Sequence, residues 1–148
     1  MSLDDEFPGV TPQLTVGDAD AAVRFYRAAF HADELLRHHG PDGRVTHCEL
    51  LVNRGRLLLH DDFAGQSPTA LGGTPVTLHL YVDDVDAAFA TALAAGATSL
   101  MDPADQFWGD RYAMIQDPFG HRWSLATPRE DLSIEEMRER SDRWAAEA

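Results

Sequence analysis

Histidine and glutamate side chains stand on segments whose alternation of polar and apolar residues is typical of β-strands. His47 and Glu49 alternate with apolar residues over 45–52, so both share one strand face, and His79 stands in a second alternating segment over 76–82. Imidazole and carboxylate groups act as general acids and bases. If the protein catalyses a reaction without a metal, we expect Glu49, paired with His79 or His47, to move the proton.

The same side chains form an alternative set of metal ligands, namely His47, Glu49, His60 and His79. Two histidines and one carboxylate suit Zn²⁺ or Fe²⁺, and Ni²⁺ and Mn²⁺ are further candidates. Hydrogen-bonded or solvent-facing histidines are the simpler interpretation, so we expect no metal cofactor.

A second candidate group lies in the segment 106–112. Trp108 offers a ring for stacking, and Arg111 offers a planar fork that can bind a carboxylate or a phosphate. The alternative is structural: Trp108 would close the mouth of a cavity, and Arg111 would pair with Asp105 or Asp110. The sequence favours neither interpretation.

The elements that must position these residues occur twice. Residues 14–23 are repeated at 80–89, a shift of 66 positions, and the shift pairs Thr11 with Thr77 and Gln13 with His79. A repeat of this length is a supersecondary module. Two such modules set side by side can line a concave pocket with the polar faces of their strands.

Each module has the predicted order β-α-β-β-β. Asp18 and Asp84 precede the helices and are typical N-caps, and Gly96 stands where a left-handed C-terminal cap belongs. The expected segments are strands at 10–16, 35–38, 45–52 and 56–60 in module one (about 8–63), a linker at 64–74, strands at 76–82, 98–101, 111–116 and 121–127 in module two (75–127), a loop at 103–110, and a helix at 133–147.

Composition narrows the class of protein. A chain of 148 residues is most simply one domain, here of the α+β class. The net charge of −13 argues against nucleic acid as a partner and suits a cationic ligand, although solubility alone also explains it. Cys48 is the only cysteine, and the chain has neither an apolar run long enough for a bilayer nor a secretory signal. We therefore expect a cytoplasmic protein without a membrane partner.

The repeated plan, with Asp117-Pro118-Phe119-Gly120-His121 before the last strand, resembles the vicinal oxygen chelate superfamily of glyoxalases, bleomycin resistance proteins and dioxygenases. The segments 105–112 and 78–86 are similar to its PhnB-like branch. The resemblance implies two βαβββ modules that enclose a shared cavity, followed here by a C-terminal helix, in a homodimer.

Enzymes of that superfamily hold a divalent metal with side chains from several strands. By motif, these positions correspond to Thr11, Thr77, Ser124 and either Leu59 or His60. Hydroxyl groups bind Zn²⁺, Ni²⁺ or Fe²⁺ poorly compared with imidazole or carboxylate groups. The usual metal site is therefore expected to be missing.

The sequence thus predicts a protein similar to bleomycin resistance proteins that binds a small molecule without a metal and sequesters an antibiotic or a metabolite. The alternative is a lyase or isomerase of the glyoxalase type that uses an unusual metal site or a Glu/His pair, and a purely structural dimer is a third interpretation. The expected ligand-binding residues are Gln13, His47, Glu49, Thr77, His79, Tyr81, Trp108, Arg111 and Ser124.

Overall fold

The computed structural model describes residues 9–148, which form two compact units. Unit 1 contains the described residues up to Pro75 together with the short segment Pro118–His121, and unit 2 contains Val76–Asp117 and Arg122–Ala148. Each unit holds one of the two predicted modules.

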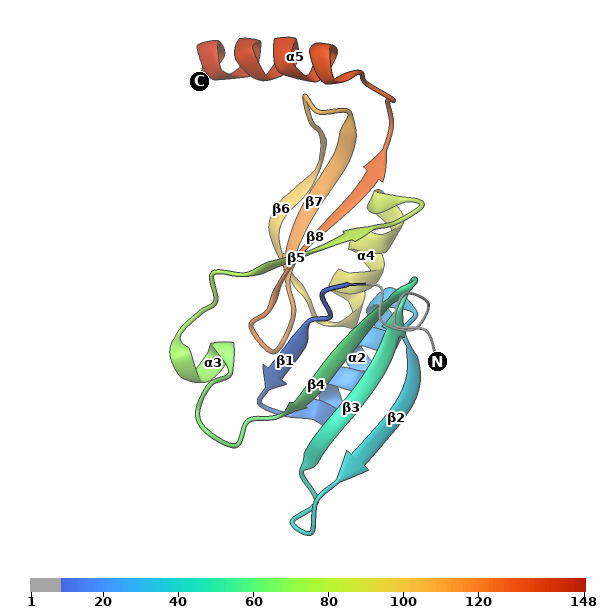
Figure 1. The fold of residues 1–148 in the computed structure, drawn as a ribbon, viewed down its shortest axis with the longest axis vertical. Coiled ribbons are helices and arrows are strands. Elements are labelled where there is room, and N and C mark those ends of the chain that lie inside the picture. The colour runs from blue at the N-terminus through green and yellow to red at the C-terminus, as the bar shows by residue number, and fades with distance from the viewer. Residues whose placement is uncertain (1–8) are drawn as a thin grey trace. The chain divides into compact units, whose positions relative to one another are not determined.

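Unit 1 is a four-stranded mixed sheet with one long helix on one face (Figure 1). The strand order is β1-β4-β3-β2, with β1 parallel to β4 and the other neighbours antiparallel. The elements are β1 (Gln13–Val16), α2 (Ala19–Phe30), β2 (Asp33–His39), β3 (Val45–Val52), β4 (Gly55–Asp61) and α3 (Pro68–Leu71).

The core of unit 1 lies between the sheet and α2. Leu50 and Leu59 of the sheet and Val23 and Tyr26 of the helix are fully buried, as the alternation in β3 and β4 and the helical spacing in α2 require. Asp18 caps α2 by accepting a hydrogen bond from the amide of Ala21 at 3.0 Å. The predicted N-cap is therefore confirmed.

Unit 2 repeats the plan of unit 1. The strand order is β5-β8-β7-β6, with β5 parallel to β8, and α4 packs on one face (Figure 1). The elements are β5 (Thr77–Tyr81), α4 (Val85–Ala95), β6 (Thr98–Asp105), β7 (Asp110–Gln116), β8 (Arg122–Pro128) and α5 (Ile134–Glu147). The predicted α+β class and both βαβββ modules are confirmed.

Buried side chains from three elements form the core of unit 2. Ile115 and Leu125 of the sheet are fully buried, and Val85 of α4 is fully buried as well. Trp123 is also buried, and its indole N–H donates to the carboxylate of Asp117 at 3.0 Å. Asp84 caps α4, as predicted, by accepting from the amide of Ala87.

The first strand and the linker differ from the prediction. β1 begins at Gln13 rather than at residue 10, because Pro12 has no N–H for the ladder and contributes only its carbonyl oxygen, which accepts from Leu58. The linker contains the short helix α3, which Ser67 caps by accepting from the amide of Ala70. The composition of Gly, Ser, Pro and Thr concealed this helix.

The last part of the second module also departs from the prediction. β6 runs to Asp105, through the predicted loop, and its register against β7 shifts between Met101 and Ala104. Such an irregularity lets a strand accommodate Pro103, which has no N–H for the ladder. Gly96 ends α4 with a positive φ of 121°, but outside the left-handed helical region that was predicted.

The turn 118–121 between β7 and β8 packs within unit 1. The ring of Phe119 contacts those of Phe25 and Tyr26, with centroids 6.2 and 6.4 Å apart. His121 Nε2 lies 2.9 Å from the carbonyl oxygen of Thr15. The motif Asp-Pro-Phe-Gly-His therefore supplies packing and a hydrogen bond to unit 1.

The predicted C-terminal helix is confirmed as α5, which Ser133 caps by accepting from the amide of Glu136. None of its residues is buried, although Trp144 packs against Phe107 with ring centroids 5.4 Å apart. Across residues 9–148, the helices lack the length and apolar composition that a bilayer crossing needs.

Candidate functional site

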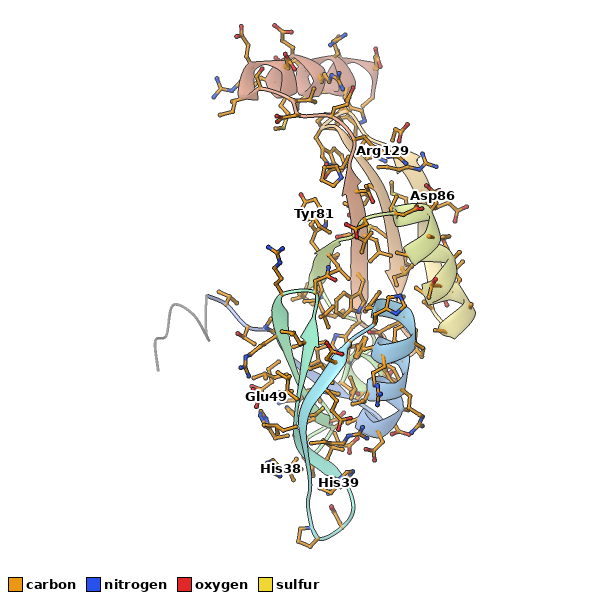
Figure 2. All side chains as sticks on the ribbon, turned by 90° about the vertical axis from the view of Figure 1, so that its right-hand side faces the viewer. His38, His39, Glu49, Tyr81, Asp86 and Arg129 are labelled. Carbon is orange, nitrogen blue, oxygen red and sulfur yellow. The ribbon has the colours of Figure 1, made fainter. Side chains whose placement is uncertain are left out.

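Each sheet has an open face, which we define as the face opposite its long helix, α2 in unit 1 and α4 in unit 2. In unit 1 the open face carries a charged group on β3 and β4. Glu49 accepts a hydrogen bond from Arg56 at 3.1 Å, and its other oxygen lies 3.5 Å from His47 Nε2. The carboxylate of Glu49, whose position Figure 2 labels, is thus bound by one guanidinium and faces one imidazole.

Strand register places further predicted residues on this face. Leu58 pairs with Gln13 on one side and with Glu49 on the other, so these three side chains form one row across the sheet. His60 pairs with Thr15, and its Nδ1 donates to the carbonyl oxygen of Asp61, 2.8 Å away. Leu59 is fully buried on the α2 side. Of the two candidates Leu59 and His60, only His60 is on the open face.

In unit 2 the open face is centred on a contact between β5 and β8. His79 Nδ1 lies 2.5 Å from Ser124 Oγ, and the two residues pair directly in the parallel register. Ser124 is 2% exposed, whereas His79 is exposed. The buried hydroxyl therefore fixes the orientation of the His79 ring through Nδ1. The other ring nitrogen, Nε2, takes no part in this contact.

Aromatic rings surround His79. Tyr112 of β7 stacks with it at 6.0 Å between centroids, and Tyr81 meets it edge-on at 4.7 Å. Trp108 meets Tyr112 edge-on at 5.5 Å, and Phe107 meets Trp108 in the same way at 5.1 Å. We call this group, His79, Tyr81, Phe107, Trp108 and Tyr112, the aromatic cluster. Ring faces of this kind bind flat apolar molecules and cations.

A cation stands beside this cluster on the same sheet. Arg122 pairs with Thr77 in register, two residues from Ser124 along β8. Its Nε is buried and has no hydrogen-bond partner among residues 9–148. A donor left in this state costs free energy until an acceptor reaches it.

Trp108 and Arg111, which the sequence presented as one group, have different surroundings. Trp108 joins the aromatic cluster and donates its indole N–H to Asp110 at 3.1 Å. Arg111 turns to the α4 side, where it donates twice to Asp86, at 2.8 and 3.1 Å, and once to Asp105 at 3.2 Å. Arg111 lowers the pKa of Asp86 through these hydrogen bonds. The prediction that Arg111 pairs with Asp105 or Asp110 is therefore confirmed for Asp105. It did not include Asp86, which accepts two of the three hydrogen bonds.

The residues at the superfamily's metal positions do not fit a metal ion. Thr77 and Ser124 offer hydroxyls, and that of Ser124 is engaged by His79. Among residues 9–148 no group of three or more His, Cys, Asp or Glu side chains is arranged to hold a metal. The alternative ligands have other partners: Glu49 binds Arg56, and His60 contacts Asp61 O. The absence of a metal stays a prediction that metal analysis can check.

The structure brings the predicted residues together in two groups, Gln13, His47 and Glu49 in unit 1 and Thr77, His79, Tyr81, Trp108 and Ser124 in unit 2. The acid–base pair of Glu49 with His79 draws one residue from each unit and stays a prediction. Sequence reasoning missed three residues, Arg56, Tyr112 and Arg122. Continued alternation along β4, β7 and β8 was the signal that placed them on the open faces.

Three comparisons relate the chain to known proteins. The profile of the Glyoxalase/Bleomycin resistance protein/Dioxygenase superfamily matches residues 10–125. An uncharacterized protein of Mycobacterium bovis is 49% identical over 136 residues, which cover 88% of this chain and 90% of the relative. A second protein of that organism, named "Putative glyoxylase CFP32", is 30% identical over 123 residues, 78% of this chain and 42% of its own length.

A solved structure extends these matches to three dimensions. TioX from Micromonospora sp. ML1 is 28% identical and superimposes with a TM-score of 0.66, covering 80% of this chain and 97% of TioX. The family profile spans most of the chain, and the duplicated βαβββ fold agrees with it. The chain therefore belongs to the glyoxalase/bleomycin resistance protein/dioxygenase superfamily.

Proposed function

We propose that this protein binds a small molecule without a metal ion and acts by sequestering it, as an antibiotic- or metabolite-binding member of its superfamily. The observation that carries the proposal is the aromatic cluster anchored by the 2.5 Å contact of His79 with Ser124. At Ser124, one of the positions where a metalloenzyme of the family would need a strong ligand, the chain has a hydroxyl that is bound to His79.

The chemistry of the cluster favours an aromatic ligand that carries a positive charge. The faces of Tyr112 and Trp108 have a negative quadrupole that attracts cations, and the net charge of −13 adds a long-range attraction. The buried Nε of Arg122 would be satisfied by an acceptor atom on the ligand. The proposed ligand is therefore a flat aromatic cation with at least one hydrogen-bond acceptor.

Further parts of this proposal rest on the sequence. The segments 105–112 and 78–86 support the PhnB-like branch. We also propose that the protein is cytoplasmic and forms a homodimer. The lyase or isomerase alternative draws its support from the 30% identity with the protein named "Putative glyoxylase CFP32", and it would use Glu49 and His79 as the acid–base pair.

Fluorescence titration with ethidium, a flat aromatic cation, and with bleomycin tests the proposal. His79→Ala and Tyr112→Ala should each weaken binding by about fivefold or more, since each removes a stacking face worth roughly 1 kcal/mol or more. His39→Ala is the matched control, because His39 pairs with Asp20 of α2. Equal affinity of all three variants for a compound that binds the native protein would overturn the proposed site.

A further inference from the structure

Unit 2 also contains a hollow, which touches the aromatic cluster through Asp110, the acceptor of the Trp108 indole N–H. It is open, has a volume of about 620 Å³, and lies where the first turn of α4, the β6–β7 turn, the segment after β8 and α5 converge. Its lining includes Asp86, Asp105, Asp110, Arg111, Arg129 and Arg140. This volume is in the range of pockets that hold small molecules.

Two of the three guanidinium groups in the hollow are already committed. Arg111 binds Asp86 and Asp105. Arg140 donates twice to Glu130, at 2.5 and 3.3 Å, and once to the carbonyl oxygen of Phe107 at 3.4 Å. These ion pairs fix the walls of the hollow but leave little capacity for a ligand.

Arg129 is the exception. Its side chain forms no hydrogen bond or ion pair among residues 9–148, and its one electrostatic effect is a weak lowering of the pKa of Asp86. Figure 2 labels both residues on unit 2. The backbone holds Arg129 in place, since its amide and that of Glu130 both donate to the carbonyl oxygen of Gly109, at 2.9 and 3.1 Å. A fixed backbone with an uncommitted guanidinium is suited to a carboxylate.

Asp110 supplies the opposite charge. Asp110 is 9% exposed as a whole residue, and Oδ2 accepts from the indole N–H of Trp108 at 3.1 Å. Its other oxygen, Oδ1, has no hydrogen-bond partner among residues 9–148, so this residue of the hollow's lining has one acceptor unused. Such a group is suited to an ammonium or another cationic donor.

We infer that this hollow binds a small zwitterion, whose carboxylate is bound by Arg129 and whose ammonium is bound by Asp110. A simple anion does not match the lining, because four carboxylates and three guanidiniums line the hollow. A simple cation leaves Arg129 unpaired. A molecule with both charges matches both groups, and the class includes free amino acids. The inference does not depend on the function proposed for the aromatic cluster.

The test uses a series of zwitterions whose charges are set at increasing distances: glycine, β-alanine, 4-aminobutyrate and 6-aminohexanoate. Each is titrated at millimolar concentration into the full-length protein labelled with ¹⁵N. The reporters are two N–H signals, that of the Trp108 indole, which donates a hydrogen bond to Asp110, and that of the Gly109 amide. At least one member should shift both signals, while its methyl ester and its N-acetyl derivative should bind at least about tenfold more weakly.

Variants locate the site. Arg129→Gln and Asp110→Asn should each weaken binding of that member by about tenfold or more, whereas Arg24→Gln, on the exposed face of α2, should leave it unchanged. Asn at position 110 retains an oxygen for Trp108, and an unshifted melting temperature would verify its fold. The inference is overturned if no member shifts the reporters, if the ester or the acetylated form binds equally well, or if Arg129→Gln binds like the native protein.

Discussion

His79 Nδ1 lies 2.5 Å from Ser124 Oγ, across the parallel pair of β5 and β8. If the hydroxyl donates to Nδ1, the neutral ring carries its proton on Nε2 and presents a donor to the ligand. Ser124→Ala removes this constraint. We expect the ¹⁵N shifts of the His79 ring to move toward a mixture of tautomers, and the free energy of unfolding to fall by about 1 kcal/mol. Ser99→Ala, which removes a hydrogen bond to Asp102, is the control and should leave the His79 ring signals unchanged.

Gly120 makes a close contact within unit 1. A Cβ atom at this position would lie 2.8 Å from Cβ of Pro68, and φ is +89°. Gly43 has a similar φ of +83° with no atom within 4 Å of its Cβ position, so it isolates the conformational cost. Gly43→Ala should cost about 1 kcal/mol, and Gly120→Ala about 2 kcal/mol more because of the clash. Urea denaturation compares the two, and equal losses would show that the turn 118–121 packs more loosely than described.

Asp61 joins two elements of unit 1. It is 8% exposed, Oδ1 accepts from the amide of Ala19 at 2.8 Å, and Oδ2 accepts from that of Val45 at 2.6 Å. Asp61→Asn places an NH₂ group opposite one of these amides, so the free energy of unfolding should fall by about 2–3 kcal/mol. Asp83→Asn, at an exposed position, should change it little. Similar melting curves for the two variants would rule out this role for Asp61.

Asp62 should contribute to stability at neutral pH and lose that contribution in acid. Its carboxylate accepts from the amides of Gln66, Ser67 and Ala64, and these hydrogen bonds hold its pKa well below the ordinary value of 3.8. A depressed folded-state pKa stabilises the protein above pH 3.8, and the effect is lost as the pH falls toward the folded-state value. Asp62→Asn should therefore flatten the fall in melting temperature below about pH 4. An unchanged acid limb would contradict the hydrogen bonds seen here.

Cys48 should be unreactive while the protein is folded. Its side chain is fully buried in β3, and burial raises the pKa of the thiol to about 11. Because the thiolate is the reactive form, a thiol reagent at pH 8 should modify Cys48 only after denaturation. Mass spectrometry measures the rate of modification. Rapid modification of the native protein would contradict this prediction and show that unit 1 opens locally.

Local signals were sufficient to predict much of the fold. β3 spans 45–52 as the alternation indicated, and Asp18 and Asp84 cap their helices as their positions indicated. These local signals do not predict contacts between segments that are far apart in the sequence. Arg111 finds Asp86, which lies 25 residues away, rather than Asp110, its neighbour in sequence.

The candidate site shows the same division. Alternation placed His79 and Tyr81 on one face of β5, but the partner that stacks on His79 is Tyr112, which only the register of β7 against β8 reveals. The unsatisfied Nε of Arg122 depends on burial by surrounding atoms, and no local pattern reports that.

We propose that the protein binds its ligand without a metal ion. The most direct measurement is calorimetric titration of a flat aromatic cation into protein stripped with a chelator and then into protein supplied with Zn²⁺, Ni²⁺, Mn²⁺ or Fe²⁺, together with metal analysis of untagged protein. We predict less than stoichiometric metal, equal affinity in both preparations, and stabilisation of about 2.7 kcal/mol at a hundredfold excess over Kd. Stoichiometric metal that is lost in Glu49→Ala or His79→Ala, with binding that requires it, would contradict the claim.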